Sequence, residues 1–116
     1  MLYLASPYTH ENPIIMEHRY KYMLQVCAYF ANNKICVYSP IVHWHPVAKL
    51  HSLPKEFEFW QEFDRQFLDS CDEMLIIPLQ GWEDSKGINA EVDYCEEQDI
   101  PFRLMDTIEL HRVLNA

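Results

Sequence analysis

One stretch of the chain constrains its fold more than any other: an apolar run at residues 74–79 that ends in a turn and leads into a helix. A short apolar run bounded by turn residues is typical of a buried strand, and a strand followed by a helix is the repeating unit of parallel α/β sheets. Glu91 lies about two turns into that helix. Ligands of parallel sheets bind beyond the carboxyl ends of the strands, where helix N-termini attract anions. The stretch therefore predicts a parallel sheet with a reactive carboxylate in its crevice.

Strand and helix patterns alternate along the rest of the chain. Short apolar runs predict strands at residues 1–5, 35–38, 72–79 and 100–105. Apolar residues at helical spacing predict helices at residues 14–32, over about 17 residues from Pro54, at residues 85–98, and from the capping residue Asp106 to about Leu114. Residues 39–46 are bounded by prolines, so we expect an ordered loop there over one end of the sheet.

This order of elements predicts an α/β fold. We expect a doubly wound parallel sheet of four to five strands, with helices on both faces because crossover connections are right-handed. The chain has 116 residues and no linker or repeat, so a single domain over residues 1–116 is expected. In so small a sheet, the apolar helix faces are candidates for the interface of a homodimer or a higher homo-oligomer.

The charge balance and the absence of certain segments limit the expected partners. Eighteen acidic residues against nine basic ones give a net charge of −9, which repels nucleic-acid polymers, and no basic patch is evident. No apolar run of about 18 residues and no signal segment occurs, so neither membrane insertion nor secretion is expected. The four cysteines form no CxxC pair and are expected to be buried free thiols of a cytoplasmic protein. Small molecules are therefore the expected partners.

Three side chains are candidates for catalysis because a parallel sheet would bring them together. Tyr3 lies near the carboxyl end of the first strand, Asp64 lies mid-helix among aromatic residues, and Glu91 follows the third strand. Aspartate is a poor mid-helix residue, and its burial beside rings costs free energy unless something compensates. Each residue also has an ordinary explanation: a core aromatic for Tyr3, a solvated helix face for Asp64, and an acid favoured by the helix dipole for Glu91.

Two histidines, His43 and His45, alternate around Trp44 in the expected loop. In an extended segment both imidazoles point the same way, which favours contact with a substrate at the mouth of a pocket. Structural loop histidines are one alternative and a metal pair is another, but no third ligand of suitable spacing is evident, so no metal is expected. Trp82 is a candidate wall of the pocket or, equally, an ordinary packed loop residue.

Three motifs carry a resemblance to a known family. They are Tyr-Leu-Ala-Ser-Pro-Tyr near the start, Phe-Asp-Arg-Gln-Phe-Leu-Asp-Ser-Cys-Asp before the third strand, and Gly-Trp-Glu-Asp-Ser-Lys-Gly-Ile-Asn-Ala-Glu after it. In this order the chain resembles the nucleoside 2-deoxyribosyltransferase superfamily, which includes the nucleoside 5′-monophosphate N-glycosidases. The resemblance covers nearly the whole chain and is closest to a small branch of that superfamily. It implies a flavodoxin-like fold that is commonly dimeric.

The resemblance also implies roles for individual residues. Glu91 would attack or stabilise the anomeric carbon of the sugar, Asp64 would handle the proton on the leaving base, and Tyr3 would position the glutamate. Ser85 stands where the transferases hold the sugar with an aspartate and the monophosphate glycosidases meet phosphate with a serine. It therefore favours a nucleotide substrate, with Gly87 giving the backbone room and helix amides facing the phosphate.

The loop after the first strand departs from the family pattern. The resemblance places Ser6, Pro7 and Tyr8 in the substrate-binding loop, but the glycines and the arginine of the monophosphate glycosidases are missing there. Ser6 and Thr9 would be weaker phosphate ligands. This difference supports a second hypothesis, a non-catalytic nucleotide-binding or sensing module. A purely structural dimerisation domain is the third.

The chemistry of the candidate residues agrees with the resemblance. Cleavage of an N-glycosidic bond passes through an oxocarbenium-like state, so one carboxylate must face the sugar while a second group protonates the base. Retaining glycosidases hold two such carboxyls about 5–5.5 Å apart. A buried Asp64 with a raised pKa would supply the acid at neutral pH. We therefore expect an enzyme without a cofactor that hydrolyses or exchanges the base–sugar bond of a nucleoside or nucleoside 5′-monophosphate, and Ser85 favours hydrolysis.

Overall fold

A computed structural model of the chain describes residues 1–115; Ala116, the last residue of the expected domain, lies outside the described residues. Within them, an all-parallel sheet has the order β2-β1-β3-β4, with strands β1 (Leu2–Ala5), β2 (Val37–Tyr38), β3 (Glu73–Ile76) and β4 (Phe102–Leu104). The helices are α1 (Pro13–Asn32), α2 (Pro40–His51), α3 (Phe57–Asp69), α4 (Lys86–Gln98) and α5 (Thr107–Leu114), with the short 3₁₀ helix η1 (Trp82–Asp84) before α4. The expected flavodoxin-like α/β fold is confirmed.

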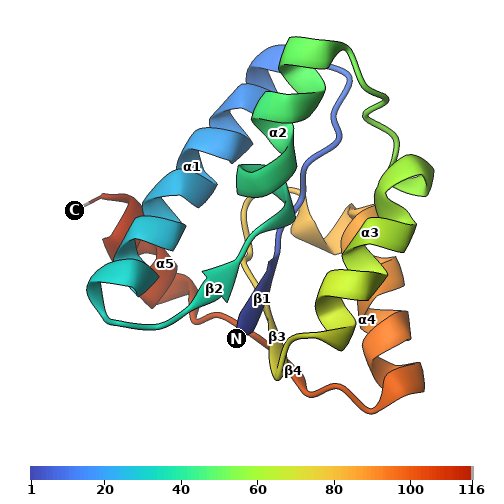
Figure 1. The fold of residues 1–116 in the computed structure, drawn as a ribbon. Coiled ribbons are helices and arrows are strands. Elements are labelled where there is room, and N and C mark those ends of the chain that lie inside the picture. Colours follow the sequence, from blue (N-terminus) through green and yellow to red (C-terminus); the bar gives the residue numbers. More distant parts are fainter. Residues whose placement is uncertain (116) are drawn as a thin grey trace.

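Two helical layers cover the sheet. Figure 1 shows α1 and α5 on one side of it and α3 and α4 on the other. Alternate side chains of β1 enter different cores, because successive residues of a strand point to opposite faces. Leu4 packs with Met23 of α1, whereas Tyr3 packs with Leu68 of α3 and Cys95 of α4. Both faces of β1 are therefore buried, which explains why this strand is apolar along its whole length.

The strand order creates a crevice at one end of the sheet. The chain leaves β1 toward one edge of the sheet and leaves β3 toward the other. Doubly wound sheets bind ligands at such a switch point, beyond the carboxyl ends of the strands. The N–H of Ile77 donates to the carbonyl oxygen of Ala5 at 2.8 Å, which keeps the two strands together as far as the crevice.

The expected loop at residues 39–46 is wrong, because these residues begin and form most of α2. The Ser39 hydroxyl accepts a hydrogen bond from the N–H of Val42 at 3.3 Å and so caps the helix. Pro40 occupies the first helical position, where a missing N–H costs little. Pro46 removes one hydrogen bond from the helix interior, and the packing of α2 against α1 offsets this cost.

The other elements lie near their expected positions, with shorter strands. Helix α3 begins at Phe57 rather than Pro54 and has 13 residues rather than about 17. All four cysteines are free thiols, but the expectation that all are buried is wrong: Cys27 is half-buried and Cys36 is exposed. Within residues 1–115, no helix combines the length and the apolar character needed to cross a membrane.

Candidate functional site

A cavity of about 1100 Å³ opens at the switch point of the sheet. It is slightly larger than most small-molecule sites, which measure roughly 300–1,000 Å³. Its walls come from the loops after β1 and β3, from α1, α2 and α5, and from α3 and α4. Most residues singled out from the sequence line it: Ser6, Pro7, Tyr8, His45, Asp64, Ser85, Gly87 and Glu91.

Glu91 enters the cavity from α4 and is only 8% exposed. The Ser85 hydroxyl caps α4 by accepting from the N–H of Ile88 at 3.2 Å, which sets the helix so that Glu91 shares its buried face with Ile88 and Cys95. The hydroxyl of Tyr3 donates a hydrogen bond to the Glu91 carboxylate. Tyr3 is fully buried and does not line the cavity, so it acts on a ligand only through Glu91.

Asp64 enters the same cavity from α3. Trp60 and Leu68 are the buried residues of that helix. Asp64 lies four residues from each of them and therefore shares their face. Its Oδ1 atom is buried and has no hydrogen-bond partner within the part of the chain that the structure describes, residues 1–115. The solvated helix face considered from the sequence is thus not where this carboxyl lies.

The surroundings of the two carboxyls raise the pKa of both. Burial raises the pKa of Asp64 to about 7, although the Tyr3 hydroxyl opposes the rise. Burial also raises the pKa of Glu91 well above its usual value; the charge of Asp64 adds to this, and the hydrogen bond from Tyr3 opposes it. Two carboxylates in one dry site repel each other, so the pair holds at least one proton near neutral pH. The site can therefore present one carboxylate and one carboxylic acid together.

Arg19 of α1 ties the two loops of the crevice together. Its guanidinium donates to the carbonyl oxygens of Tyr8 at 3.2 Å, Thr9 at 3.1 Å and Gln80 at 3.1 Å. Gly81 has φ of +92°, and a Cβ there would lie 2.8 Å from Nη2 of Arg19. Sequence reasoning missed Arg19. Gly81 indicates a position where another group approaches the backbone closely, but that group, Arg19, is distant in the sequence.

The start of α4 offers hydrogen-bond donors to an anion. The Ser85 hydroxyl uses a lone pair for the cap, which leaves its hydrogen free to donate. A Cβ at Gly87 would meet the Phe57 ring at 3.6 Å, an ordinary contact, so packing within the protein does not require glycine there. The hydroxyl of Ser6 is buried without a hydrogen-bond partner among residues 1–115.

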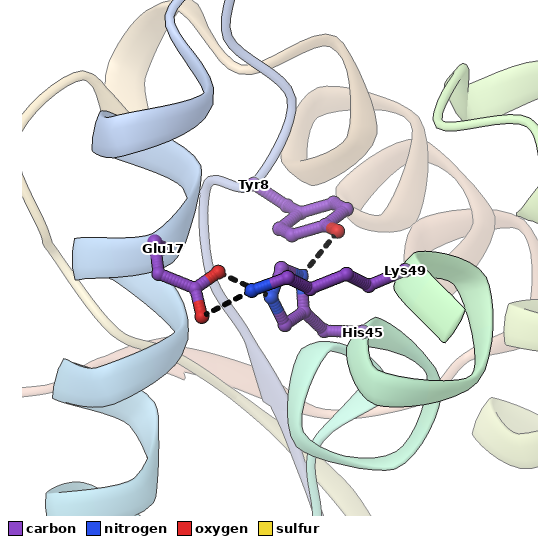
Figure 2. Close-up of polar contacts among 4 residues, drawn as sticks. All are labelled: Tyr8, Glu17, His45 and Lys49. Carbon is purple, nitrogen blue, oxygen red and sulfur yellow. Dashed lines mark hydrogen bonds and ion pairs between the residues drawn. The ribbon is translucent and has the colours of Figure 1, made fainter. Parts of the chain in front are cut away.

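A second polar cluster joins α1, α2 and the loop after β1 (Figure 2), and two of its members, Tyr8 and His45, line the cavity. His45 is 6% exposed, and its Nδ1 lies 2.6 Å from the Tyr8 hydroxyl while its Nε2 lies 2.8 Å from a carboxylate oxygen of Glu17. Lys49 donates to the other Glu17 oxygen at 3.3 Å. The ring of Tyr20 packs on the imidazole, with centroids 4.4 Å apart. Sequence reasoning missed Glu17 and Lys49, because nothing in the local pattern connects them to a histidine on another helix.

Two residues predicted from the sequence, His43 and Trp82, do not line the cavity. Residues two apart in a helix point roughly 200° away from each other. The expectation that His43 and His45 point the same way is therefore wrong, and the same geometry separates them as metal ligands. His43 lies between the rings of Tyr38 and Trp44, at centroid distances of 5.6 and 4.5 Å. Trp82 packs against the core between the sheet and α3 and α4 instead of forming a cavity wall.

Among residues 1–115, no group of three or more histidine, cysteine, aspartate or glutamate side chains is placed to hold a metal ion. The polar groups of the cavity thus come together as an acid pair and a histidine-centred cluster.

A comparison with curated proteins found no match. The model of a family described as a domain of unknown function (DUF1937) matches residues 1–107. This range includes both acids, the tyrosine beneath Glu91, and every member of the cluster around His45. The chain therefore belongs to the DUF1937 family.

Proposed function

We propose that the chain is an enzyme that breaks the base–sugar bond of a nucleoside or nucleoside 5′-monophosphate, by hydrolysis or by exchange of the base. The observation that carries the proposal is the hydrogen bond from Tyr3 to Glu91 in a cavity that Asp64 also lines. The resemblance to the nucleoside 2-deoxyribosyltransferase superfamily supports the same roles for these three residues.

The two acids have different roles in the reaction because their surroundings differ. The Glu91 carboxylate faces the anomeric carbon and stabilises the positive charge that develops as the C1′–N bond breaks. Burial and the charge of Asp64 raise the pKa of Glu91, so its ionised form depends on the hydrogen bond from Tyr3 and on the proton that neutralises Asp64. Asp64, with its pKa raised to about 7, gives its proton to the departing base nitrogen. A water molecule then adds to C1′ and returns its proton to Asp64, which restores the site.

Contacts for a 5′-phosphate lie along the loop after β1 and the start of α4. Ser6 and Ser85 supply hydroxyl donors, and the first amides of α4 add the favourable field of a helix N-terminus. Arg19 supplies positive charge beside the loop, although from a helix and not from the loop itself. Ser85 makes hydrolysis the favoured reaction.

The test is to incubate the protein with a panel of nucleosides and 5′-monophosphates and to measure the release of free base by chromatography. We expect Glu91→Gln to lower the rate by at least about 10³-fold, because it removes the charge that faces the sugar. Glu97→Gln is the matched control: the same substitution at an exposed site of the same helix should leave the rate unchanged. Equal rates in the two variants would contradict the role of Glu91, and no base release from any substrate would overturn the enzyme.

A nucleotide-binding module without catalysis is the second candidate. The loop after β1 motivates it, because the carbonyl groups of Tyr8 and Thr9 are held by Arg19 and the loop has no glycine to bring its amides close to a phosphate. Calorimetry that shows tight nucleotide binding, together with no base release from the whole panel, would favour this candidate over the enzyme.

A further inference from the structure

The side chains of Tyr8, His45 and Glu17 form a continuous hydrogen-bonded chain behind the cavity wall. Figure 2 shows the imidazole between the phenol and the carboxylate, at 2.6 and 2.8 Å. Tyr8 and His45 line the cavity, whereas Glu17 does not. A change in the protonation of the imidazole can therefore affect a ligand in the cavity through the Tyr8 hydroxyl.

The charge of Glu17 determines which groups donate and which accept in these hydrogen bonds. Burial opposes that charge, but hydrogen bonds from His45 and Lys49 lower the pKa of Glu17 on balance, so it is ionised near neutral pH. It therefore accepts from the Nε2–H of His45. A neutral imidazole with its hydrogen on Nε2 has a lone pair on Nδ1, which accepts the hydrogen of the Tyr8 hydroxyl. In this state the Tyr8 oxygen offers only lone pairs to the cavity.

Protonation of His45 reverses the direction of its hydrogen bond with Tyr8. Both nitrogens of an imidazolium carry hydrogen, so Nδ1 donates to the Tyr8 oxygen and the hydroxyl hydrogen becomes free to point into the cavity. Burial, with a smaller contribution from the charge of Glu17, raises the pKa of Tyr8 to about 12, so the hydroxyl keeps its hydrogen in both states.

The titratable groups around His45 come from three segments. Tyr8 lies on the loop after β1, Glu17 and Tyr20 lie on α1, and Lys49 lies on the same helix as His45. Glu17 carries the charge that is bonded directly to the imidazole, and Lys49 contacts the far oxygen of that carboxylate. The groups around the imidazole are thus one carboxylate, one ammonium held by that carboxylate, and two phenols.

We propose that Tyr8 is a positioning residue that accepts a hydrogen bond from a donor group of the ligand when His45 is neutral and donates one to an acceptor group when His45 is protonated. The donor is a sugar hydroxyl or an exocyclic amine of the base, an identification that rests on the proposed function. Ligand choice thus depends on the protonation of His45: donors are preferred when the imidazole is neutral, and acceptors when it is charged.

If the hydrogen bonds among Tyr8, His45 and Glu17 were purely structural, they would only hold α2 on α1. Tyr20 provides the matched control for that possibility, because its ring packs on the same imidazole but does not line the cavity. Tyr20→Phe and Tyr8→Phe each remove one hydroxyl beside His45. A structural role predicts changes in stability alone, whereas the proposal predicts a change in ligand binding that only Tyr8→Phe shows.

The first measurement is the protonation of the His45 ring nitrogens by ¹⁵N NMR on the full chain. In the neutral imidazole we expect hydrogen on Nε2 and none on Nδ1, and in the imidazolium we expect hydrogen on both. Hydrogen on Nδ1 of the neutral imidazole would overturn the proposal, whatever the protein catalyses.

The second measurement is the dissociation constant of adenosine, 2′-deoxyadenosine and purine riboside, at one pH where NMR finds His45 neutral and at one where it finds His45 protonated. With His45 neutral, Tyr8→Phe should weaken adenosine binding about 5- to 10-fold, and Tyr20→Phe should leave it unchanged. The analogue that lacks the donor bound by Tyr8 should show no such loss, which separates the hydroxyl from the amine.

The outcomes separate this inference from the proposed function. Equal effects of Tyr8→Phe and Tyr20→Phe, with base release still dependent on Glu91, would overturn only the role of Tyr8. Binding that depends on Tyr8 and on pH, without base release, would support this inference while the enzyme fails. If neither these three nucleosides nor their 5′-monophosphates bind the unmodified protein, both proposals fall.

Discussion

Two polar clusters lie at different walls of one cavity, and they differ in how their charge is balanced. The paired cluster consists of Tyr8, Glu17, His45 and Lys49 between α1 and α2 (Figure 2). Every one of its polar side chains has a partner, and a lysine compensates the single carboxylate. Such a cluster costs little free energy to bury, because each group recovers its hydrogen bonds.

The acid pair, Asp64 and Glu91, lies between α3 and α4 and is balanced poorly. The Tyr3 hydroxyl is bonded to Glu91, while one oxygen of Asp64 has no partner within residues 1–115. Neither carboxyl is stabilised by a cation among these residues; instead burial raises the pKa of both. The pair is therefore held in place at a cost in free energy.

This difference indicates that the paired cluster stabilises the fold and that the acid pair is suited to proton transfer. Buried groups with strongly raised pKa values in a cavity are candidates for proton transfer, whereas a satisfied network holds helices in place. Loss of a side chain should therefore change stability with opposite signs in the two clusters.

His45→Ala should have the largest effect. It leaves the Glu17 carboxylate and the Tyr8 hydroxyl without their shared partner, so we expect the free energy of unfolding to fall by roughly 2–4 kcal/mol. Urea denaturation measures the change. His51→Ala, at an exposed position of the same helix, should cost less than about 0.5 kcal/mol. A loss in His45→Ala no greater than in this control would remove the distinction between the clusters.

Asp64→Asn should act in the opposite direction. The folded protein binds the Asp64 proton more tightly than the unfolded chain does, since the pKa is about 7 when folded and about 3.9 when unfolded. The carboxyl therefore lowers stability progressively as pH rises from about 4 to about 7, and the amide avoids this penalty. We expect thermal or urea unfolding to show a gain of about 2 kcal/mol at about pH 8 and none at about pH 4.

Asp93→Asn is the control for that experiment. Asp93 is exposed on α4, and its substitution corrects for the loss of one negative charge from a chain with a net charge of −9. If both variants gain the same stability at every pH, the burial of Asp64 is not the cause.

Tyr3→Phe should change the ionisation of Glu91 without touching the ligand. Loss of the donated hydrogen bond raises the pKa of Glu91 further, so the acid limb of the pH–rate profile for base release should move to higher pH. Tyr38→Phe is the matched control: its ring lies 5.7 Å from that of Tyr3, and its hydroxyl has no partner among residues 1–115. Identical profiles in the two variants would show that the Tyr3 hydroxyl does not set the charge of Glu91.

Lys49→Met should have the smallest effect. Its side chain is 63% exposed, so its ion pair with Glu17 is screened by water and salt. We expect a loss of less than about 0.5 kcal/mol in the free energy of unfolding, and a smaller loss when salt is added. A loss above about 1.5 kcal/mol would mean that the lysine is essential to the paired cluster, and not an accessory to it.

Some parts of this molecule follow from short stretches of sequence, and others do not. The cap of α5 could be predicted because Asp106 accepts from N–H groups only two and three residues away. Helix α2 could not, because the prolines at residues 40 and 46 favour a loop locally, and contact with α1 overrides that preference. The wrong prediction for His43 followed directly from the missed helix.

The sequence by itself determined the order of strands and helices and the presence of an acid in the helix after β3, because apolar spacing and helix caps act over a few residues. Only the tertiary structure decided that Tyr3 meets Glu91 across 88 residues and that His45 meets Glu17 across 28. Hydrogen bonds of this kind depend on how the layers pack over the sheet, and no local periodicity encodes which polar side chains that packing brings together.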